Sequence, residues 1–189
     1  MASDVQICNR ALQIIGATTR ITALTDSNQA ARDLNTMYAP VRDAELRKHP
    51  WSFALARVVL APSASAPVFE FDYAFQLPSD FLRLHPDYEY QAETDWQIEG
   101  NQLLTNDGDT LYLRYVKQVT DANLFDALFR EALAAQLAYQ MAPPVTKNNT
   151  TRQDALNAYN LTIREAKKVN AIEKVSAKTP DASWITARK

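Results

Sequence analysis

The chain has 189 residues, of which 47% are hydrophobic and 22% charged, so it is long enough to fold without metal or disulfide cross-links. Its formal net charge of −2 argues against a general nucleic-acid-binding protein. No apolar stretch approaches the roughly 20 residues of a membrane helix, and the N-terminus has no signal-peptide pattern, so we expect a protein made in the cytoplasm that does not enter a membrane.

The N-terminal part of the sequence predicts two helices. Apolar residues at helical spacing predict a first helix over 4–15, capped by Ser3 and ended by Gly16. Cys8, the single cysteine, lies on the apolar stripe of this helix and is interpreted as a small core residue. A second pattern predicts a helix from after Asp26 to about residue 48, with Pro40 expected to kink it or to begin a new segment.

The middle of the sequence has the patterns of β-strands. A first strand is expected over 54–61. In residues 68–76 aromatic and polar residues alternate, which predicts one strand with a wholly aromatic face. Gly100 and Gly108 mark two expected hairpin turns, and a further strand follows the second turn.

Two more helices are expected over 124–141 and 151–173, the first of them stopped by Pro143-Pro144. The short linker between them predicts antiparallel packing. The residues from 175 onwards are polar and are interpreted as an extended tail. The predicted fold class is therefore α+β, with an antiparallel helical bundle from the N- and C-terminal helices, a central antiparallel β insertion and an extended C-terminal tail.

The expected organisation has four parts, and their charges differ. They are the N-terminal helices (1–53), the β-rich region (54–120), the C-terminal helices (121–173) and the tail (174–189). Residues 61–120 carry 3 basic and 10 acidic side chains, a net charge of −7, whereas the flanking segments are mildly basic.

The sequence has no convincing catalytic, cofactor or metal motif. His49 and His85 are far apart and lack a cysteine cluster, and the pair Asp107 and Asp109 lacks the glutamate that completes a calcium loop. We therefore predict no enzymatic activity, no cofactor and no metal. One alternative stays open: carboxylates of the β region could form a glycosidase pair, which would make the protein a glycan or cell-wall hydrolase. The candidate carboxylates are Glu89, Glu93, Asp95 and Glu99.

An ordered set of short motifs carries a resemblance to a known family. The set begins with Pro50-Trp51-Ser52-Phe53 and Ala56-Arg57-Val58-Val59-Leu60, and continues with the run from Tyr73 to Arg83, Ile98-Glu99-Gly100, Leu113-Arg114-Tyr115-Val116 and the segment from Phe129 to Ala138. Over about residues 4–173 the chain resembles the tail tubular protein A family, the head-to-tail adaptors of short-tailed bacteriophages.

The resemblance implies a structural virion protein at the head–tail junction that takes part in DNA ejection. Members of the family form a ring of twelve copies beneath the portal protein. Their β part faces the tail nozzle protein, and DNA passes through the lumen without sequence-specific binding. No membrane is involved.

Two sets of site residues follow as hypotheses. An apolar pair in a polar tail is typical of a segment that docks in a groove on a partner, so we expect portal contacts in the tail. These residues are Lys178, Trp184, Ile185 and Arg188. An acidic lining would repel DNA phosphates, so acidic residues of the β region are expected to face the nozzle or the lumen. They are Asp87, Glu89, Glu93, Asp95, Asp107 and Asp109.

Overall fold

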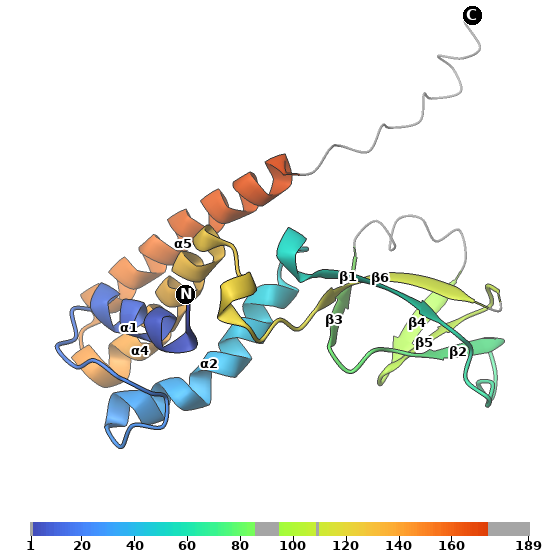
Figure 1. Cartoon of the computed structure of the whole chain (residues 1–189), viewed down its shortest axis with the longest axis horizontal. Helices are drawn as coiled ribbons and strands as arrows, with labels where there is room; N and C mark the ends of the chain where they lie inside the picture. The colour runs from blue at the N-terminus through green and yellow to red at the C-terminus, as the bar shows by residue number, and fades with distance from the viewer. Residues whose placement is uncertain (1, 86–94, 109, 174–189) are drawn as a thin grey trace, which may run out of the picture.

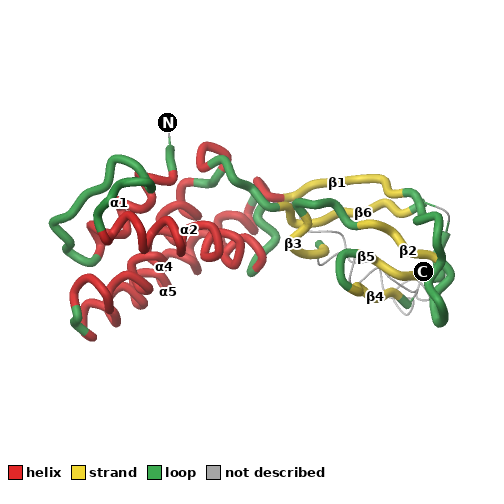
Figure 2. The backbone as a smooth tube through the Cα atoms, turned by 90° about the horizontal axis from the view of Figure 1, so that it is seen from below, coloured by secondary structure: helices red, strands yellow, loops and turns green. Residues whose placement is uncertain are grey.

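The computed structural model of the chain describes residues 2–85, 95–108 and 110–173. These residues form four α-helices and two small antiparallel sheets, which confirms the mixed α+β class. The helices lie at one end of an elongated molecule and the strands at the other (Figure 1, Figure 2).

The described residues contain the following elements. The α-helices are α1 (Asp4–Ile14), α2 (Gln29–Arg47), α4 (Ala127–Thr146) and α5 (Asn149–Ile172). The strands are β1 (Leu55–Leu60), β2 (Tyr73–Gln76), β3 (Phe81–Leu84), β4 (Trp96–Glu99), β5 (Gln102–Thr105) and β6 (Leu111–Lys117). Two short 3₁₀ helices, η1 (Ser52–Ala54) and η2 (Ala122–Leu124), lie between the helical and β parts of the sequence.

Helix α1 begins and ends where its sequence predicts. The Ser3 side chain accepts a hydrogen bond from the backbone N–H of Gln6, which caps the first turn. At the other end Gly16 has a φ of 70°, and the N–H groups of Gly16 and Ala17 donate to the carbonyls of Gln13 and Leu12. This is a Schellman cap, in which a residue without a side chain takes the left-handed position at no steric cost.

Three prolines at which the sequence predicts a helix to kink, stop or restart lie inside continuous helices. Of the two alternatives predicted at Pro40, a kink or a new segment, the second is wrong, because α2 runs as one element across it. Helix α4 includes Pro143 and Pro144 and ends only at Lys147, which has a φ of 52°. A proline loses its own N–H bond but its carbonyl still accepts, and the Pro143 carbonyl accepts from the backbone N–H of Lys147.

The predicted strand over 68–76 is wrong in its first half. Only β2 is extended, because the backbone of Glu70 has a φ of 75° and cannot continue a strand. Val68 is 96% exposed and Phe69 is 77% exposed, so these two side chains do not belong to a buried aromatic face.

The hairpin predicted at Gly108 is also wrong, whereas the one at Gly100 is confirmed. Strands β4 and β5 pair across Gly100, which has a φ of 58°. Strands β5 and β6 do not pair with each other. Strand β5 lies between β2 and β4 in one sheet, and β6 lies between β1 and β3 in the other. The segment after Thr105 therefore crosses from one sheet to the other.

The two sheets pack face to face around a small apolar core. Alternate residues of β1 and β6 point inward, and the buried side chains of β2, β3 and β5 meet them there. The buried members of this core are Phe75, Leu77, Leu84, Leu103, Leu111, Leu113 and Tyr115. The acidic β region thus has its own interior, which leaves most of its charged side chains on the surface.

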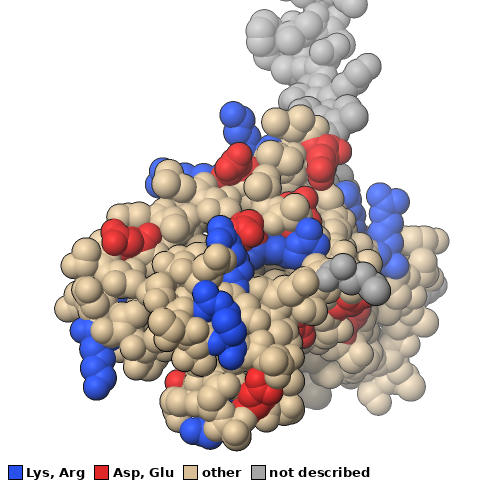
Figure 3. Space-filling model, turned by 60° about the vertical axis from the view of Figure 1, so that its left-hand side comes forward, with Lys and Arg blue, Asp and Glu red and all other residues tan. Residues whose placement is uncertain are grey.

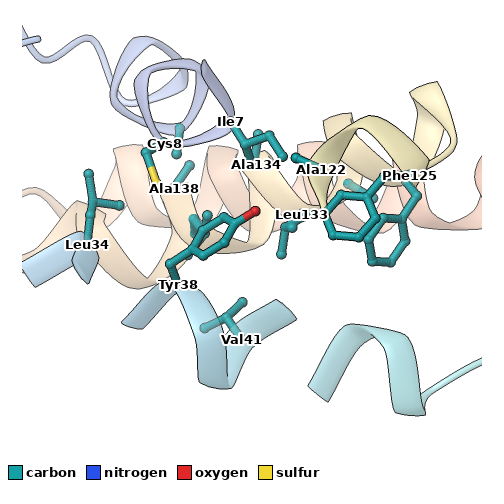
Figure 4. Packing of buried hydrophobic residues seen from close by; sticks show 14 of the residues in the cluster. Ile7, Cys8, Leu34, Tyr38, Val41, Ala122, Phe125, Leu133, Ala134 and Ala138 are labelled. Carbon is teal, nitrogen blue, oxygen red and sulfur yellow. The ribbon is translucent and has the colours of Figure 1, made fainter. Parts of the chain in front are cut away.

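Helix α4 forms the centre of the helical core. It contacts α1, α2 and α5, which explains why it is apolar on nearly all sides. Figure 4 shows Leu133 and Ala134 of α4 between side chains of α1 and α2. Nearby, the hydroxyl of Tyr38 donates to Asp4 at 2.7 Å and links α2 to the first turn of α1.

A cluster of aromatic rings joins the helical core to the start of the sheets. The Phe129 ring of α4 is fully buried, with centroid distances of 5.0 Å to Trp51, 5.1 Å to Phe53 and 5.2 Å to Phe125. Trp51 donates from its indole nitrogen to the carbonyl of Glu45 at 3.1 Å. Because Trp51 and Phe53 lie directly before β1, this cluster fixes where the β part leaves the helices.

Two side chains of α5 are bonded to the same junction. The Asn170 side chain accepts from the backbone N–H of Ser52 at 2.8 Å and contacts the His49 ring nitrogen at 2.9 Å. The Tyr159 hydroxyl donates to the Glu45 carboxylate at 2.9 Å. Helix α5 is therefore bonded both to the end of α2 and to η1, which directly precedes β1.

Candidate functional site

The most exposed large apolar side chains lie at the end of the molecule farthest from the helices (Figure 1). They belong to the loop that joins β1 to β2, and several acidic residues surround them. We call this surface the tip. It consists of Val68, Phe69, Glu70, Asp72, Asp95 and Asp107.

The loop of the tip is held by one asparagine side chain. Asn106 accepts from the backbone N–H of Asp72 at 2.8 Å and donates to the carbonyl of Glu70 at 3.4 Å. The carbonyl of Phe69 accepts from the N–H of Phe71 at 2.9 Å, which closes a tight turn. These bonds place Phe69 in solvent in a defined loop.

Two of the predicted acidic residues come together at the tip. The Thr105 hydroxyl donates to the carbonyl of Asp95 at 3.2 Å and accepts from the backbone N–H of Asp107 at 3.2 Å. Both carboxylate residues are exposed. They thus lie side by side at the open end of the β4–β5 hairpin.

The other predicted site residues cannot be placed. Asp87, Glu89, Glu93 and Asp109 lie outside the described residues, and so do the four portal-contact candidates, Lys178, Trp184, Ile185 and Arg188. Both hypotheses about them remain predictions.

Sequence reasoning missed four residues of the tip. Phe69 was assigned to the aromatic face of a strand that began near Val68, and Glu70 and Asp72 were assigned to its polar face. The signal that could have separated them from β2 is weak, because alternation of aromatic and polar residues continues through the loop. The left-handed backbone of Glu70 separates the loop from the strand, and no residue pattern in the sequence predicts it.

The two described candidates for a glycosidase pair, Asp95 and Glu99, lie at opposite ends of β4. Asp95 directly precedes β4 and Glu99 ends it. Four steps along an extended strand place their Cα atoms about 13 Å apart, whereas the carboxyl groups of a glycosidase pair are roughly 5–9.5 Å apart. The remaining candidates, Glu89 and Glu93, lie outside the described residues.

A second exposed surface lies on the outer face of the β1–β6 pair, and we call it the flank. Val59 and Tyr112 are cross-strand partners, and their exposed fractions are 59% and 74%. The adjacent pair on the same face is Arg57 and Arg114. The flank thus combines an exposed apolar pair with two arginines.

Helix α5 exposes a third apolar surface. Leu161, Val169 and Ile172 lie on the side of α5 that faces away from the helical core. The helical end of the molecule also carries charged side chains of both signs, which are interspersed on the face that Figure 3 shows.

Burial raises the pKa of several groups in the described part of the chain, among them Cys8 and Tyr115. Burial, with a smaller effect of the Asp4 charge, raises the pKa of the Cys8 thiol to about 12. Burial and the hydrogen bond to Asp80 raise the pKa of Tyr115 to about 12. Both groups are therefore neutral at physiological pH and behave as parts of the core.

The described part of the chain has neither a candidate metal site nor a candidate membrane span. Among them no group of three or more His, Cys, Asp and Glu side chains could hold a metal ion. Within the same ranges, none of the helices has the length and apolarity needed to cross a membrane. Comparisons of the sequence with models of protein families and with curated proteins gave no match.

Proposed function

We propose that this protein is a structural subunit of a head-to-tail adaptor ring that links the portal of a short-tailed bacteriophage to its tail nozzle and forms part of the DNA conduit. The observation that carries the proposal is the exposure of large apolar side chains on separate faces at both ends of an elongated subunit. These faces are the tip, the flank and the outer side of α5.

A closed ring explains why one subunit would expose several such faces. Each subunit of a ring contacts its two neighbours through two different surfaces. An adaptor also contacts a protein above the ring and another below it. Contiguous exposed apolar side chains are typical of surfaces that bind other proteins.

The acidic charge of the β region favours a conduit for DNA. Residues 61–120 have a net charge of −7, and the described acidic residues of the tip are exposed. A surface of this charge repels phosphates and gains nothing from counterion release, so DNA would pass along it without being held.

Binding to the portal tests this function. We expect the full chain to bind the portal protein encoded in the same genome and a chain truncated after Glu173 to lose that binding, because the apolar pair Trp184 and Ile185 is removed. Portal capture by surface plasmon resonance measures both. The truncated chain should keep the thermal unfolding midpoint of the full chain within about 2 °C, since the described core ends before residue 174.

Two results would count against the proposal in different ways. A full chain that does not bind the portal would contradict the adaptor function. Unchanged binding by the truncated chain would contradict the assignment of portal contact to Lys178, Trp184, Ile185 and Arg188 and would leave the adaptor function standing.

A further inference from the structure

The flank continues a sheet face that the helical core covers only in part. On this outer face Leu55 and Val116 are cross-strand partners that pack against the helical core. The next outward pairs along the same face are Arg57 with Arg114, and then Val59 with Tyr112. The apolar pair lies beyond the reach of the helices, so both of its side chains are exposed.

Like the flank, the tip combines exposed apolar side chains with charged ones, but its charged side chains are acidic whereas those of the flank are basic. Val68 and Phe69 supply exposed apolar area, and Glu70 and Asp72 lie one and three positions after Phe69. The bonds from Asn106 hold the loop in place, so little conformational entropy is lost when the tip binds a partner.

We propose that the tip of one copy of this chain docks on the flank of the next copy. Phe69 and Val68 would pack against Tyr112 and Val59, and the carboxylates of Glu70 and Asp72 would face Arg57. Charge complementarity selects this occupant, because a single chain carries both an acidic apolar surface and a basic apolar surface.

The contact is heterologous, since it joins two different surfaces. Such contacts repeat from copy to copy and produce a closed ring or an open filament. In the proposed adaptor this contact would join neighbouring subunits. Its closure into a ring, as opposed to a filament, rests on the proposed function. The contact between two copies does not depend on the portal.

A charge exchange tests the contact. The flank variant is Arg57→Glu, and the tip variant is Glu70→Arg with Asp72→Arg. Each variant alone places like charges in every contact, so we expect its self-association constant to fall at least about tenfold. In an equimolar mixture each contact joins opposite charges, because the basic tip meets the acidic flank and the acidic tip meets the basic flank. Association should then return to near the wild-type level.

Sedimentation velocity over a concentration series, with and without the portal protein, measures all four samples. Arg20→Glu, in the exposed segment between α1 and α2, is the matched control, since it makes the same charge change outside the tip, the flank and α5. The flank variant should fold normally, because Arg57→Glu places opposite charges at a cross-strand pair.

The outcomes separate the contact from the proposed function. Single variants that associate like the wild type, or a mixture that does not recover, would overturn the tip–flank contact. If portal complexes also form normally in those samples, the adaptor function stands without this contact. Recovery in the mixture with no portal binding by the wild type would support the contact and contradict the adaptor function. A wild-type chain that stays monomeric in every sample would overturn both.

Discussion

Replacing Phe129 with alanine is expected to lower the free energy of unfolding by about 3–5 kcal/mol, the usual cost of removing a buried phenylalanine ring. Phe129 is fully buried and its ring contacts Trp51, Phe53 and Phe125. The substitution would leave a cavity where the helices join the sheets. The helical part can relax into this cavity only if the β part moves with it. A chain of this size should lose roughly 6–20 °C of its unfolding midpoint.

Phe69→Ala is the matched control for this prediction. It deletes the same ring from a side chain that is 77% exposed, so the unfolding midpoint should change by about 1 °C or less. The same variant should weaken self-association, because the tip loses its larger apolar side chain. Differential scanning calorimetry of both variants gives the comparison, and equal losses of stability would show that Phe129 is not the centre of the junction.

Glu45→Ala is expected to cost about 1–3 kcal/mol of stability. The Glu45 side chain is 1% exposed, accepts from the Tyr159 hydroxyl and pairs with Lys48. Removal of one member of a fully buried pair costs about 3–5 kcal/mol, because the other charge stays buried. Here the Lys48 side chain is 44% exposed and can be hydrated, so the expected loss is smaller.

The effect of Glu45→Ala should not depend on pH near neutrality. Burial lowers the pKa of Lys48, but hydrogen bonds to Glu45 and Tyr159 outweigh it and hold this pKa above its ordinary value of 10.5. A raised pKa in the folded state contributes stability that is complete below the unfolded value and is lost only as the pH rises through the folded one. The difference between variant and wild type should therefore be the same at pH 6 and pH 8.

Glu131→Ala provides the control for the buried carboxylate. Glu131 pairs with Arg10 at 3.0 Å, and both side chains are about half exposed. Urea unfolding should show a loss of at most about 1 kcal/mol for this surface pair. A loss for Glu45→Ala no larger than that for Glu131→Ala would mean that the bonds between α2 and α5 do not stabilise the junction.

Local signals in the sequence predicted those parts of the fold that depend on neighbouring residues. Ser3 and Gly16 bound α1 because a cap needs only the adjacent turn. The hairpin at Gly100 was predicted for the same reason. The crossing after Thr105 was missed, because β6 pairs with β1 and β3, which lie far away in the sequence, and no local pattern encodes which sheet a strand joins.

The candidate site was less predictable than the fold. Asp95 and Asp107 were predicted as acidic site residues, but their closeness depends on the pairing of β4 with β5. Phe69 was assigned to the aromatic face of a strand, because its alternation with polar residues continues that of β2. The family resemblance that supplied the ring, the portal and the nozzle remains a prediction, and it still needs an experiment.

The mass of the purified protein in solution, alone and with its portal protein, tests the adaptor function most directly. Mass photometry resolves both samples. We expect a complex that contains one portal and a defined ring of this chain, with about twelve copies as the family resemblance implies. A chain that stays monomeric and leaves the mass of the portal unchanged would contradict it.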